Sequence, residues 1–327
     1  MDSPTKQKAQ ELCKDLENWM SNLPIHLRSV SLIHLAIPGS HDSMTWSINR
    51  KSPMSPDAEP LLQRLRFLGS MLGYVMSRWS ITQSYDVLAQ LNSGIRYFDL
   101  RIATKTGTEQ LYFVHGLYAD DVRSPLSEIQ TFLETHPREV VILDCQHFYA
   151  FGQSDHETFM RLLTSTFGHK LLPYTQHMDH ITLEFMTTQF RYQVIVIYRS
   201  DAARFGQPLL WPAASWPTPW PNTISINKLF TTLDENLKSR SASKGYVSQC
   251  LLTPTTWFVC KHVFGTLKSE CAVPLEKHTL SWIERQRPGG SGVNIIISDF
   301  IGMSETQFSK IVIGINAKLL AESSSPT

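Results

Sequence analysis

The sequence predicts a single α/β domain, a distorted or incomplete (β/α)8 barrel of the TIM type with parallel strands. Short apolar runs rich in β-branched residues alternate with amphipathic stretches along the whole chain. Continuous apolar runs of this kind are typical of parallel strands that are buried on both faces. No linker divides the 327 residues into halves, so one large barrel is favoured over two smaller domains.

The expected elements follow from apolar spacing and from breaker residues. About seven strands are predicted, at 31–37, 95–102, 111–114, 140–145, 193–198, 246–252 and 294–298. Helices are predicted at 11–23, 61–79, 86–91, 127–135 and 156–167, the fourth of them capped by Ser124 or Ser127. The predicted layout is an N-terminal helix and lead-in packed on the barrel (1–30), the barrel itself (31–320) and a disordered tail (321–327).

Composition narrows the class of protein. The net charge of +1 gives no strong basic field, so no nucleic-acid partner is expected. Five scattered cysteines without a Cys-x-x-Cys pair favour a reduced intracellular chain. The polar N-terminus does not resemble a signal peptide, and no apolar run approaches the roughly 20 residues that span a bilayer. We expect a cytoplasmic protein with transient membrane association and no obligate protein partner.

Chemically active side chains gather at the ends of the predicted strands. In a (β/α)8 barrel the carboxyl ends of all strands meet at one face, where active sites lie. Two histidines and an arginine at that face would supply a base, an acid and a cation, which is what phosphate-ester chemistry without a metal requires. The residues at or just past strand ends are His41, Arg101, His115, Gln146, Arg199, Gln249 and Asp299.

Each of these residues alone also has an ordinary structural explanation. His41 suits a loop histidine with a local hydrogen bond, and Asp99 with Arg101 suits an ion pair inside a barrel, because residues two apart on a strand share a face. Asp299 suits a capping acid. The remaining histidines show no metal-site spacing, and Gly289–Gly292 lacks the strand and lysine of a nucleotide loop. The joint occurrence favours a site.

The strand-end motifs resemble the X domain of phosphatidylinositol-specific phospholipase C, with closest similarity to the small stand-alone X-domain proteins of animals. The resemblance covers about 19–320. The motifs that carry it are Leu35-Ala-Ile-Pro-Gly-Ser-His-Asp-Ser43, Gly94-Ile-Arg-Tyr-Phe-Asp-Leu-Arg101, Tyr112-Phe-Val-His-Gly116, His136-Pro-Arg-Glu-Val-Val-Ile-Leu143 and Asn294-Ile-Ile-Ile-Ser-Asp-Phe300.

The resemblance implies a distorted barrel and a set of catalytic residues. His41 matches the general base, His115 the general acid, and Asp299 the acid that orients the first histidine. Asp42 and Arg101 match the pair beside the phosphate in bacterial-type enzymes. It also implies that phosphatidylinositol is cleaved to diacylglycerol and a cyclic inositol phosphate, with an inositol lipid at a membrane surface as partner.

The chain departs from the calcium-dependent members of the wider family. Those enzymes carry an asparagine after the first histidine and a Glu-x-Asp pair on the second strand, where this chain has Asp42, Asp99 and Arg101. The fourth calcium position matches Gln146. A guanidinium at the cation site would repel calcium, and carboxylate ligands would be lost. We therefore expect no cofactor, no calcium and no metal site.

Head-group recognition is expected from Asp99, Gln146, Arg199 and Gln249. Arg199 matches an arginine that binds inositol hydroxyls in bacterial enzymes. Gln249 falls where those enzymes have an aspartate, and Leu251 where they have a stacking tyrosine. Trp211, Trp216 and Trp220 suit either a membrane interface or a loop packed on the barrel. Two alternatives to the phospholipase remain at this point: a catalytically weak inositol-lipid binding protein and a metal-dependent glycerophosphodiesterase.

Overall fold

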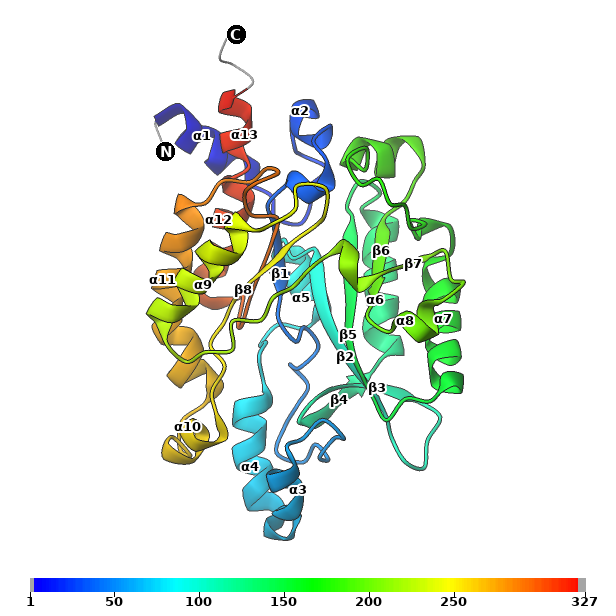
Figure 1. Cartoon of the computed structure of the whole chain (residues 1–327), viewed down its shortest axis with the longest axis vertical. Coiled ribbons are helices and arrows are strands. Elements are labelled where there is room, and N and C mark those ends of the chain that lie inside the picture. Colours follow the sequence, from blue (N-terminus) through cyan, green and yellow to red (C-terminus); the bar gives the residue numbers. More distant parts are fainter. Residues whose placement is uncertain (1–2, 323–327) are drawn as a thin grey trace.

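A curled, mostly parallel sheet forms the centre of the computed structural model, which describes residues 3–322 (Figure 1). Its main path runs β7-β6-β5-β2-β1-β9-β8, and an antiparallel hairpin of β3 and β4 extends from β2. The strands are β1 (Ile37–Ser40), β2 (Tyr97–Thr104), β3 (Leu111–His115), β4 (Leu117–Asp121), β5 (Val141–Tyr149), β6 (Val194–Tyr198), β7 (Leu210–Trp211), β8 (Val247–Cys250) and β9 (Ile295–Ser298).

The sheet is an open barrel. All strand pairs along the main path are parallel, and within residues 3–322 no ladder joins β7 to β8. An irregular segment bridges this seam instead: Val247 donates its backbone N–H to Pro217 O at 3.0 Å, and Gly245 donates to Ser215 O at 3.0 Å. The predicted incomplete (β/α) barrel is confirmed.

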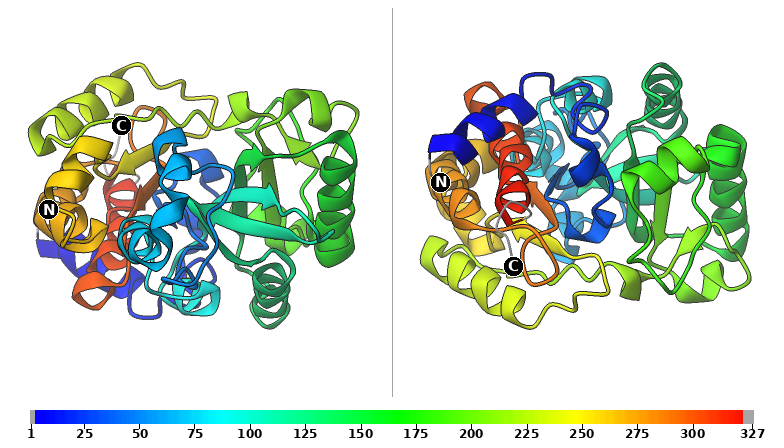
Figure 2. Two further views of the ribbon diagram at one scale, coloured as in Figure 1. Left: turned by 90° about the horizontal axis from the view of Figure 1, so that it is seen from below. Right: turned by 90° about the horizontal axis from the view of Figure 1, so that it is seen from above.

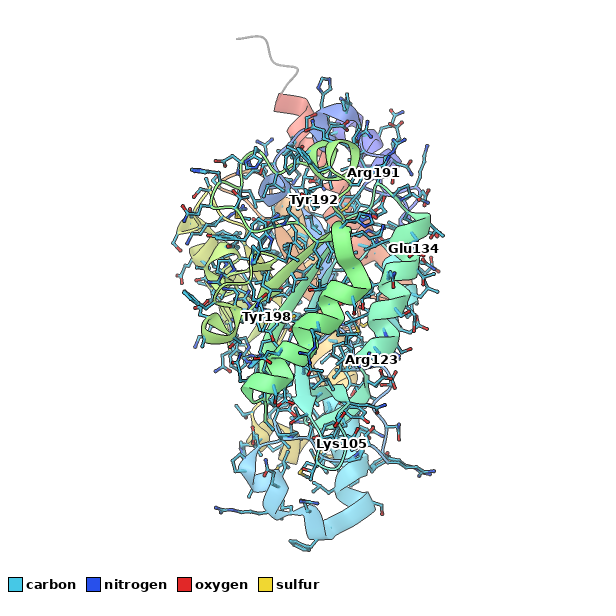
Figure 3. All side chains as sticks on the ribbon, turned by 90° about the vertical axis from the view of Figure 1, so that its right-hand side faces the viewer. Lys105, Arg123, Glu134, Arg191, Tyr192 and Tyr198 are labelled. Carbon is cyan, nitrogen blue, oxygen red and sulfur yellow. The ribbon has the colours of Figure 1, made fainter. Side chains whose placement is uncertain are left out.

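Helices cover the outer face of the sheet on both sides of the seam (Figure 2). In Figure 3, α6 and α7 lie against the β5 and β6 side of the molecule. The helices are α1 (Ser3–Leu12), α2 (Ile25–Arg28), α3 (Pro60–Arg64), α4 (Gly69–Ser80), α5 (Val87–Asn92), α6 (Arg123–Thr135), α7 (Gln153–Phe167), α8 (Asp201–Arg204), α9 (Ile226–Lys238), α10 (Thr256–Lys261), α11 (Val273–Arg285), α12 (Gln307–Gly314) and α13 (Ala317–Glu322). The 3₁₀-helices are η1 (Leu32–His34), η2 (Arg66–Leu68), η3 (Gly168–Lys170), η5 (Ala213–Ser215) and η7 (Met303–Thr306), and the π-helices are η4 (Glu184–Gln189) and η6 (Lys268–Ala272).

The apolar strand pattern reflects burial on both faces. In β6 every residue is buried, and alternate side chains enter two different cores: Val194 and Val196 pack in the cluster shared with the outer helices, Ile195 and Ile197 in the cluster inside the sheet. The inner cluster also contains Trp19 and Leu27 of the N-terminal segment. A strand of this type needs apolar residues at every position, which is why its sequence does not alternate.

Two predicted elements at the N-terminal side are wrong. The predicted helix 11–23 is absent, because α1 ends at Leu12 and the Asp15 carboxylate accepts the backbone N–H of Asn18 at 3.2 Å, a local turn that competes with a helix. The predicted strand 31–37 is a turn, η1, followed by β1. Buried Asn294 donates to Leu32 O and Leu35 O and so replaces a strand ladder for this segment.

Three further predictions need correction. The run 111–114 is a strand, but it pairs antiparallel with β2 in a hairpin and does not belong to the barrel path. The predicted helix 61–79 is broken into α3, η2 and α4, with Gly69 at φ +55° between the last two. Neither Ser124 nor Ser127 caps α6, whose N-cap residue is Val122.

α13 continues through Glu322, and the rest of the predicted tail, 323–327, lies outside the described residues, as do residues 1–2. Among the described helices, none has the length and apolar character needed to cross a bilayer. All five cysteines are free thiols.

Candidate active site

The ends of three neighbouring strands bring the central site residues together. β1 lies between β2 and β9, with Ser40 paired to both Phe98 and Ser298. His41 and Asp299 each follow the last residue of their strand, so parallel pairing places them side by side. Asp99 and Arg101 come from β2, on the other flank of β1. The sheet therefore gathers these side chains at its carboxyl edge.

His41 is held by one carboxylate and faced by others. Its Nδ1 lies 2.7 Å from Asp299 Oδ1, and its ring is buried. Arg101 Nη2 lies 3.0 Å from Nε2. Because a guanidinium only donates, this contact is a hydrogen bond only when the ring is neutral, with the proton on Nδ1 and a lone pair on Nε2. The second nitrogen thus points away from Asp299 and into the site.

The carboxylates around His41 set its protonation. Burial alone would lower the pKa of His41, but the charges of Asp42 and Asp299, with the hydrogen bond to Asp299, outweigh it and raise that pKa to about 9. Burial raises the pKa of Asp99 to about 6, an effect that Arg101 partly offsets and Asp42 enhances. Burial also opposes ionisation of Asp42, yet Arg101 and the neighbouring histidines outweigh it and lower the pKa of Asp42.

Asp42 lies between the two histidines. Its Oδ2 is 3.5 Å from His41 Nε2 and 3.3 Å from His115 Nε2, while its Oδ1 forms an ion pair with Arg101 Nε. The backbone of Asp42 has a φ of 40°, in the left-handed region that few residues adopt, and its N–H donates to Asp99 Oδ2 at 3.1 Å. This strained backbone turns the carboxylate toward both rings.

His115 ends β3 and faces His41 across the site. The two ring centroids are 6.4 Å apart at an interplanar angle of 78°. His115 Nδ1 donates to Ser80 O at 2.7 Å, the last carbonyl of α4, which has no partner within its own helix. Gly116 follows at φ +68°, and a Cβ there would come within 3.1 Å of Ser80 Oγ. The glycine lets the strand end lie against α4.

A second cluster centres on Asp144 in β5, a residue that the sequence analysis did not single out. Arg199 donates to Asp144 from Nε and Nη2, each at 2.7 Å, and Tyr97 donates its hydroxyl to the same carboxylate at 2.6 Å. Gln146 donates to Asp144 Oδ2 at 3.2 Å. The predicted head-group residues Arg199 and Gln146 therefore lie together, with the Arg199 fork held by a carboxylate.

Gln249 and Leu251 lie on the other side of the seam. Gln249 at the end of β8 donates to Thr218 Oγ1 at 3.0 Å. Leu251 is buried in the inner core, so it does not present a stacking face. Of the tryptophans, Trp211 and Trp216 are fully buried, which confirms the packed-loop alternative for those two, whereas Trp220 is exposed.

The structure adds three further residues to the site. Gln83, buried, donates its amide to His41 O at 2.9 Å and to Ser298 O at 3.0 Å, and so ties the ends of β1 and β9 together. His147 pairs in register with Arg101, across a bulge in the β2–β5 ladder. Asp144 had a readable signal, since an acid inside a buried apolar strand needs a partner. Gln83 sits in a loop with no such pattern.

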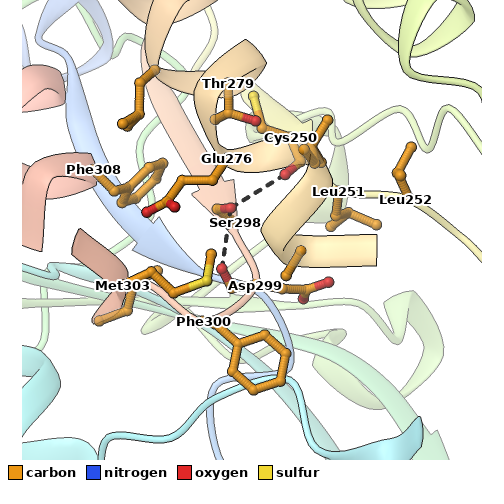
Figure 4. A pocket seen from close by; sticks show the side chains of 14 residues that line it. Cys250, Leu251, Leu252, Glu276, Thr279, Ser298, Asp299, Phe300, Met303 and Phe308 are labelled. Carbon is orange, nitrogen blue, oxygen red and sulfur yellow. Dashed lines mark hydrogen bonds between the residues drawn. The ribbon is translucent and has the colours of Figure 1, made fainter. Parts of the chain in front are cut away.

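Asp299 is also one of the residues that line a small cavity (Figure 4). The residues that line it come from β8, β9, α11 and α12 and are mostly apolar, among them Leu275, Phe300 and Phe308. Ser298 Oγ lies 3.3 Å from the carbonyl oxygens of Cys250 and Asp299. Apolar surroundings strengthen the interaction between Asp299 and His41, because less solvent screens the two groups.

The site does not suit calcium. One ligand atom each from His41, Asp42 and Asp99 lie within 4.8 Å of one another, the one such group found among the described residues. Arg101 already contacts all three, with Nη2 at 3.8 Å from Asp99 Oδ2 in addition to its contacts with the other two. Calcium takes six to eight oxygen ligands. A guanidinium among two carboxylates and an imidazole leaves neither the ligands nor the charge that this ion needs.

Comparison with known proteins identifies the fold and the relatives. No protein-family model matches the chain. It is 38% identical to mouse PI-PLC X domain-containing protein 2 over 311 residues, 94% of this chain and 89% of that protein. It is 39% identical to zebrafish PI-PLC X domain-containing protein 3 over 315 residues (95% and 96%), and 38% identical to human PI-PLC X domain-containing protein 1 over 311 residues (93% and 93%).

Several solved bacterial structures share this fold. The phosphatidylinositol-specific phospholipase C of Staphylococcus aureus, as a pentafluoro-Phe variant, matches with a TM-score of 0.64 at 18% identity, over 93% of this chain and 99% of that one. The Listeria monocytogenes enzyme matches with a TM-score of 0.62 at 18% identity, over 92% and 98%. The open barrel is therefore the fold of these bacterial proteins, and the chain belongs to the family of PI-PLC X domain-containing proteins.

Proposed function

We propose that this protein is a phospholipase C-type phosphodiesterase that cleaves phosphatidylinositol to diacylglycerol and a cyclic inositol phosphate. One observation carries the proposal: the Nε2 atoms of His41 and His115 both face Asp42 Oδ2, beside the Arg101 guanidinium. Two imidazoles around one cation are the groups that transfer of a phosphodiester to a neighbouring hydroxyl requires. The names of the bacterial proteins with this fold point to the same substrate.

In the proposed reaction the substrate supplies its own nucleophile. His41 Nε2 takes the proton of the inositol 2-hydroxyl, whose oxygen attacks phosphorus, and His115 Nε2 gives a proton to the departing diacylglycerol oxygen. Attack within one molecule lowers the entropic barrier. Asp299 keeps the His41 proton on Nδ1, as Ser80 O does for His115, so that both Nε2 atoms remain available to the substrate.

Arg101 is the proposed cation for the phosphate. Its ion pair with Asp42 fixes the guanidinium plane, and charge that builds on the phosphate oxygens is stabilised without movement of the side chain. Asp42 thus acts as a positioning residue for Arg101. No step requires a metal ion or another cofactor.

Head-group binding is assigned to the Asp144 cluster. Arg199 donates hydrogen bonds from Nε and Nη2 to Asp144, so Nη1 is the donor left for an inositol hydroxyl. Asp99, Gln146 and Gln249 add carboxylate and amide groups around it. We also propose that the protein works at the cytoplasmic surface of a membrane, where this lipid is presented.

The decisive experiment is product analysis by phosphorus NMR with phosphatidylinositol vesicles, with and without EDTA. A cyclic phosphate that forms in the presence of EDTA supports the proposal, and loss of the product in EDTA would favour a metal-dependent glycerophosphodiesterase. His41→Ala and His115→Ala should each abolish turnover while lipid binding persists. If the wild-type protein binds the lipid but releases no inositol phosphate, the binding-protein alternative is correct.

The pKa of His41 predicts how the reaction depends on pH. A base with a pKa of about 9 is unprotonated in roughly one molecule in a hundred at pH 7. We therefore expect kcat/KM to rise with pH through neutrality toward pH 9. Asp42→Asn, which removes a charge that raises this pKa, should move that rise to lower pH.

A further inference from the structure

An apolar tip projects from the barrel, in the part of the chain that connects β1 to β2. The tip is formed by α3, η2 and the first turns of α4, residues 60–74. Phe67 is 80% exposed and Met71 is 70% exposed, and Leu61, Leu68 and Tyr74 are exposed beside them. Clustered large apolar side chains in water mark an interaction surface, since isolated ones are ordinary but groups are not.

A second apolar segment reaches the same rim. Trp257 of α10 is 69% exposed, and Phe264 just after this helix is 89% exposed. Arg78 of α4 joins the two segments, with Nε on Gly265 O at 3.0 Å and Nη2 on Phe264 O at 2.7 Å. Figure 1 shows α3, α4 and α10 at one end of the molecule, the end reached from the carboxyl ends of β1 and β8.

The charge around the tip is positive. Between Ser43 and Tyr85 the basic residues outnumber the acidic ones by five to two. The basic residues are Arg50, Lys51, Arg64, Arg66 and Arg78, and the acidic ones are Asp57 and Glu59. Apolar side chains flanked by arginine and lysine complement the surface of a bilayer that contains anionic lipid.

The two segments that connect the tip to the barrel, its stems, are both hydrogen-bonded to the end of β3, which carries His115. Before the tip, Asp57 Oδ2 accepts the backbone N–H of Gly116 at 2.7 Å, and Ser55 N–H donates to Gly116 O at 3.1 Å. After the tip, Ser80 O accepts from His115 Nδ1. The position of His115 is thus fixed by the two ends of the segment that bears the apolar tip.

We propose that residues 60–74, with Trp257 and Phe264, dock on an anionic lipid bilayer, and that docking steadies His115 through the stems at Asp57 and Ser80. The inference rests on the proposed function, because a lipid substrate gives the surface its role. It assigns the membrane contact to this rim, away from the buried Trp211 and Trp216.

The docking is tested with vesicles of phosphatidylcholine and phosphatidylserine that contain no substrate. The double variant Phe67→Ser/Met71→Ser should bind at least about tenfold more weakly in sedimentation, because two large apolar side chains no longer enter the bilayer. The matched control is Ile25→Ser/Phe190→Ser, two half-exposed apolar residues at the opposite end. Phe190 precedes Arg191 and Tyr192, which Figure 3 labels near the top, far from α3 and α4.

The coupling is tested by hydrogen exchange of the peptide 111–118, whose Gly116 amide reports the contact with Asp57. Vesicles should slow its exchange in the wild type, and Asp57→Asn should bind vesicles normally with a smaller effect. Docking is refuted if the wild type does not bind, or if the control variant weakens binding as much as the tip variant. Binding without slower exchange refutes the coupling.

Neither measurement depends on turnover, so a failed docking proposal is distinct from a failed function proposal. The function is read separately on monomeric short-chain phosphatidylinositol, and the tip variant should retain wild-type turnover of this substrate. Loss of that turnover, with unchanged thermal stability, would contradict a role confined to docking. Vesicle binding that remains at wild-type strength in the tip variant would instead leave the tip for contact with another protein and overturn the inference.

Discussion

Asp299→Asn isolates the contribution of one buried charge to His41. The amide has the shape of the carboxylate and keeps an oxygen for the Nδ1–H of His41, so the change removes charge rather than packing. The pKa of His41 is raised from 6.5 to about 9, which corresponds to about 3 kcal/mol of preference for the charged ring in the folded protein. Asp42 and Asp299 are the two carboxylates that produce this rise.

Loss of the Asp299 charge should lower the pKa of His41, because this carboxylate raises it by its charge and by its hydrogen bond. We take a fall of about one pKa unit as the working magnitude, which corresponds to about 1.4 kcal/mol. Because the folded pKa lies above the unfolded one, the stabilisation is fully present below pH 6.5 and is lost as pH rises through about 9. The wild type should therefore lose about 3 kcal/mol of His41 stabilisation across that window.

The assay is chemical denaturation of both proteins at several pH values between 6.5 and 9. The variant should show a shallower decline, by about 1 kcal/mol, and a kcat lowered by up to about 10⁴-fold, as when the orienting acid of a catalytic triad is replaced by its amide. Asp99, with a pKa of about 6, titrates mainly below this window. Parallel stability curves for the two proteins would refute the proposed charge coupling.

Three further outcomes are expected. Arg101→Lys should lower kcat by roughly 10²–10³-fold with little change in lipid binding, because a point charge replaces the planar guanidinium held by Asp42. An equal kcat of variant and wild type in steady-state assays would argue against Arg101 as the cation for the phosphate. Gly116→Ala should lower the free energy of unfolding by about 1–2 kcal/mol in chemical denaturation and slow turnover, because φ is +68° and the new Cβ meets Ser80 Oγ. Gly107→Ala is the control: this residue also has a positive φ but faces open space, so the loss of stability should be smaller. EDTA should change neither the melting temperature nor turnover, and a fall in melting temperature restored by calcium would contradict the metal-free site.

The sequence predicted which side chains converge better than it predicted the elements that carry them. Parallel strands of a barrel end at one edge whatever their exact bounds, so His41, Asp299, Asp99 and Arg101 converge even though β1 begins where the predicted strand was expected to end. The prediction of fold class depended on the same robust pattern of buried apolar runs.

Some of what the sequence analysis missed has a physical cause in long-range partners. The segment 31–36 satisfies its backbone through Asn294 and Asn316, which lie more than 250 residues away in the sequence. Ser80 acts through its backbone carbonyl, and Gln83 acts from a loop through its side-chain amide. No local sequence pattern marks either contact. Local propensity cannot report such contacts, because the groups that decide them come from distant parts of the chain.

The open seam makes one side of the barrel mouth less rigid than the other. His41 stands at the end of β1, which has a hydrogen-bonded neighbour on each flank, whereas Gln249 belongs to β8, an edge strand at the seam that only an irregular segment bridges. Edge strands open locally at a lower free energy than central ones. In the proposed reaction the general base, His41, is thus anchored where the sheet is least deformable, while the edge strand that carries Gln249, assigned to the head group, retains room to adjust.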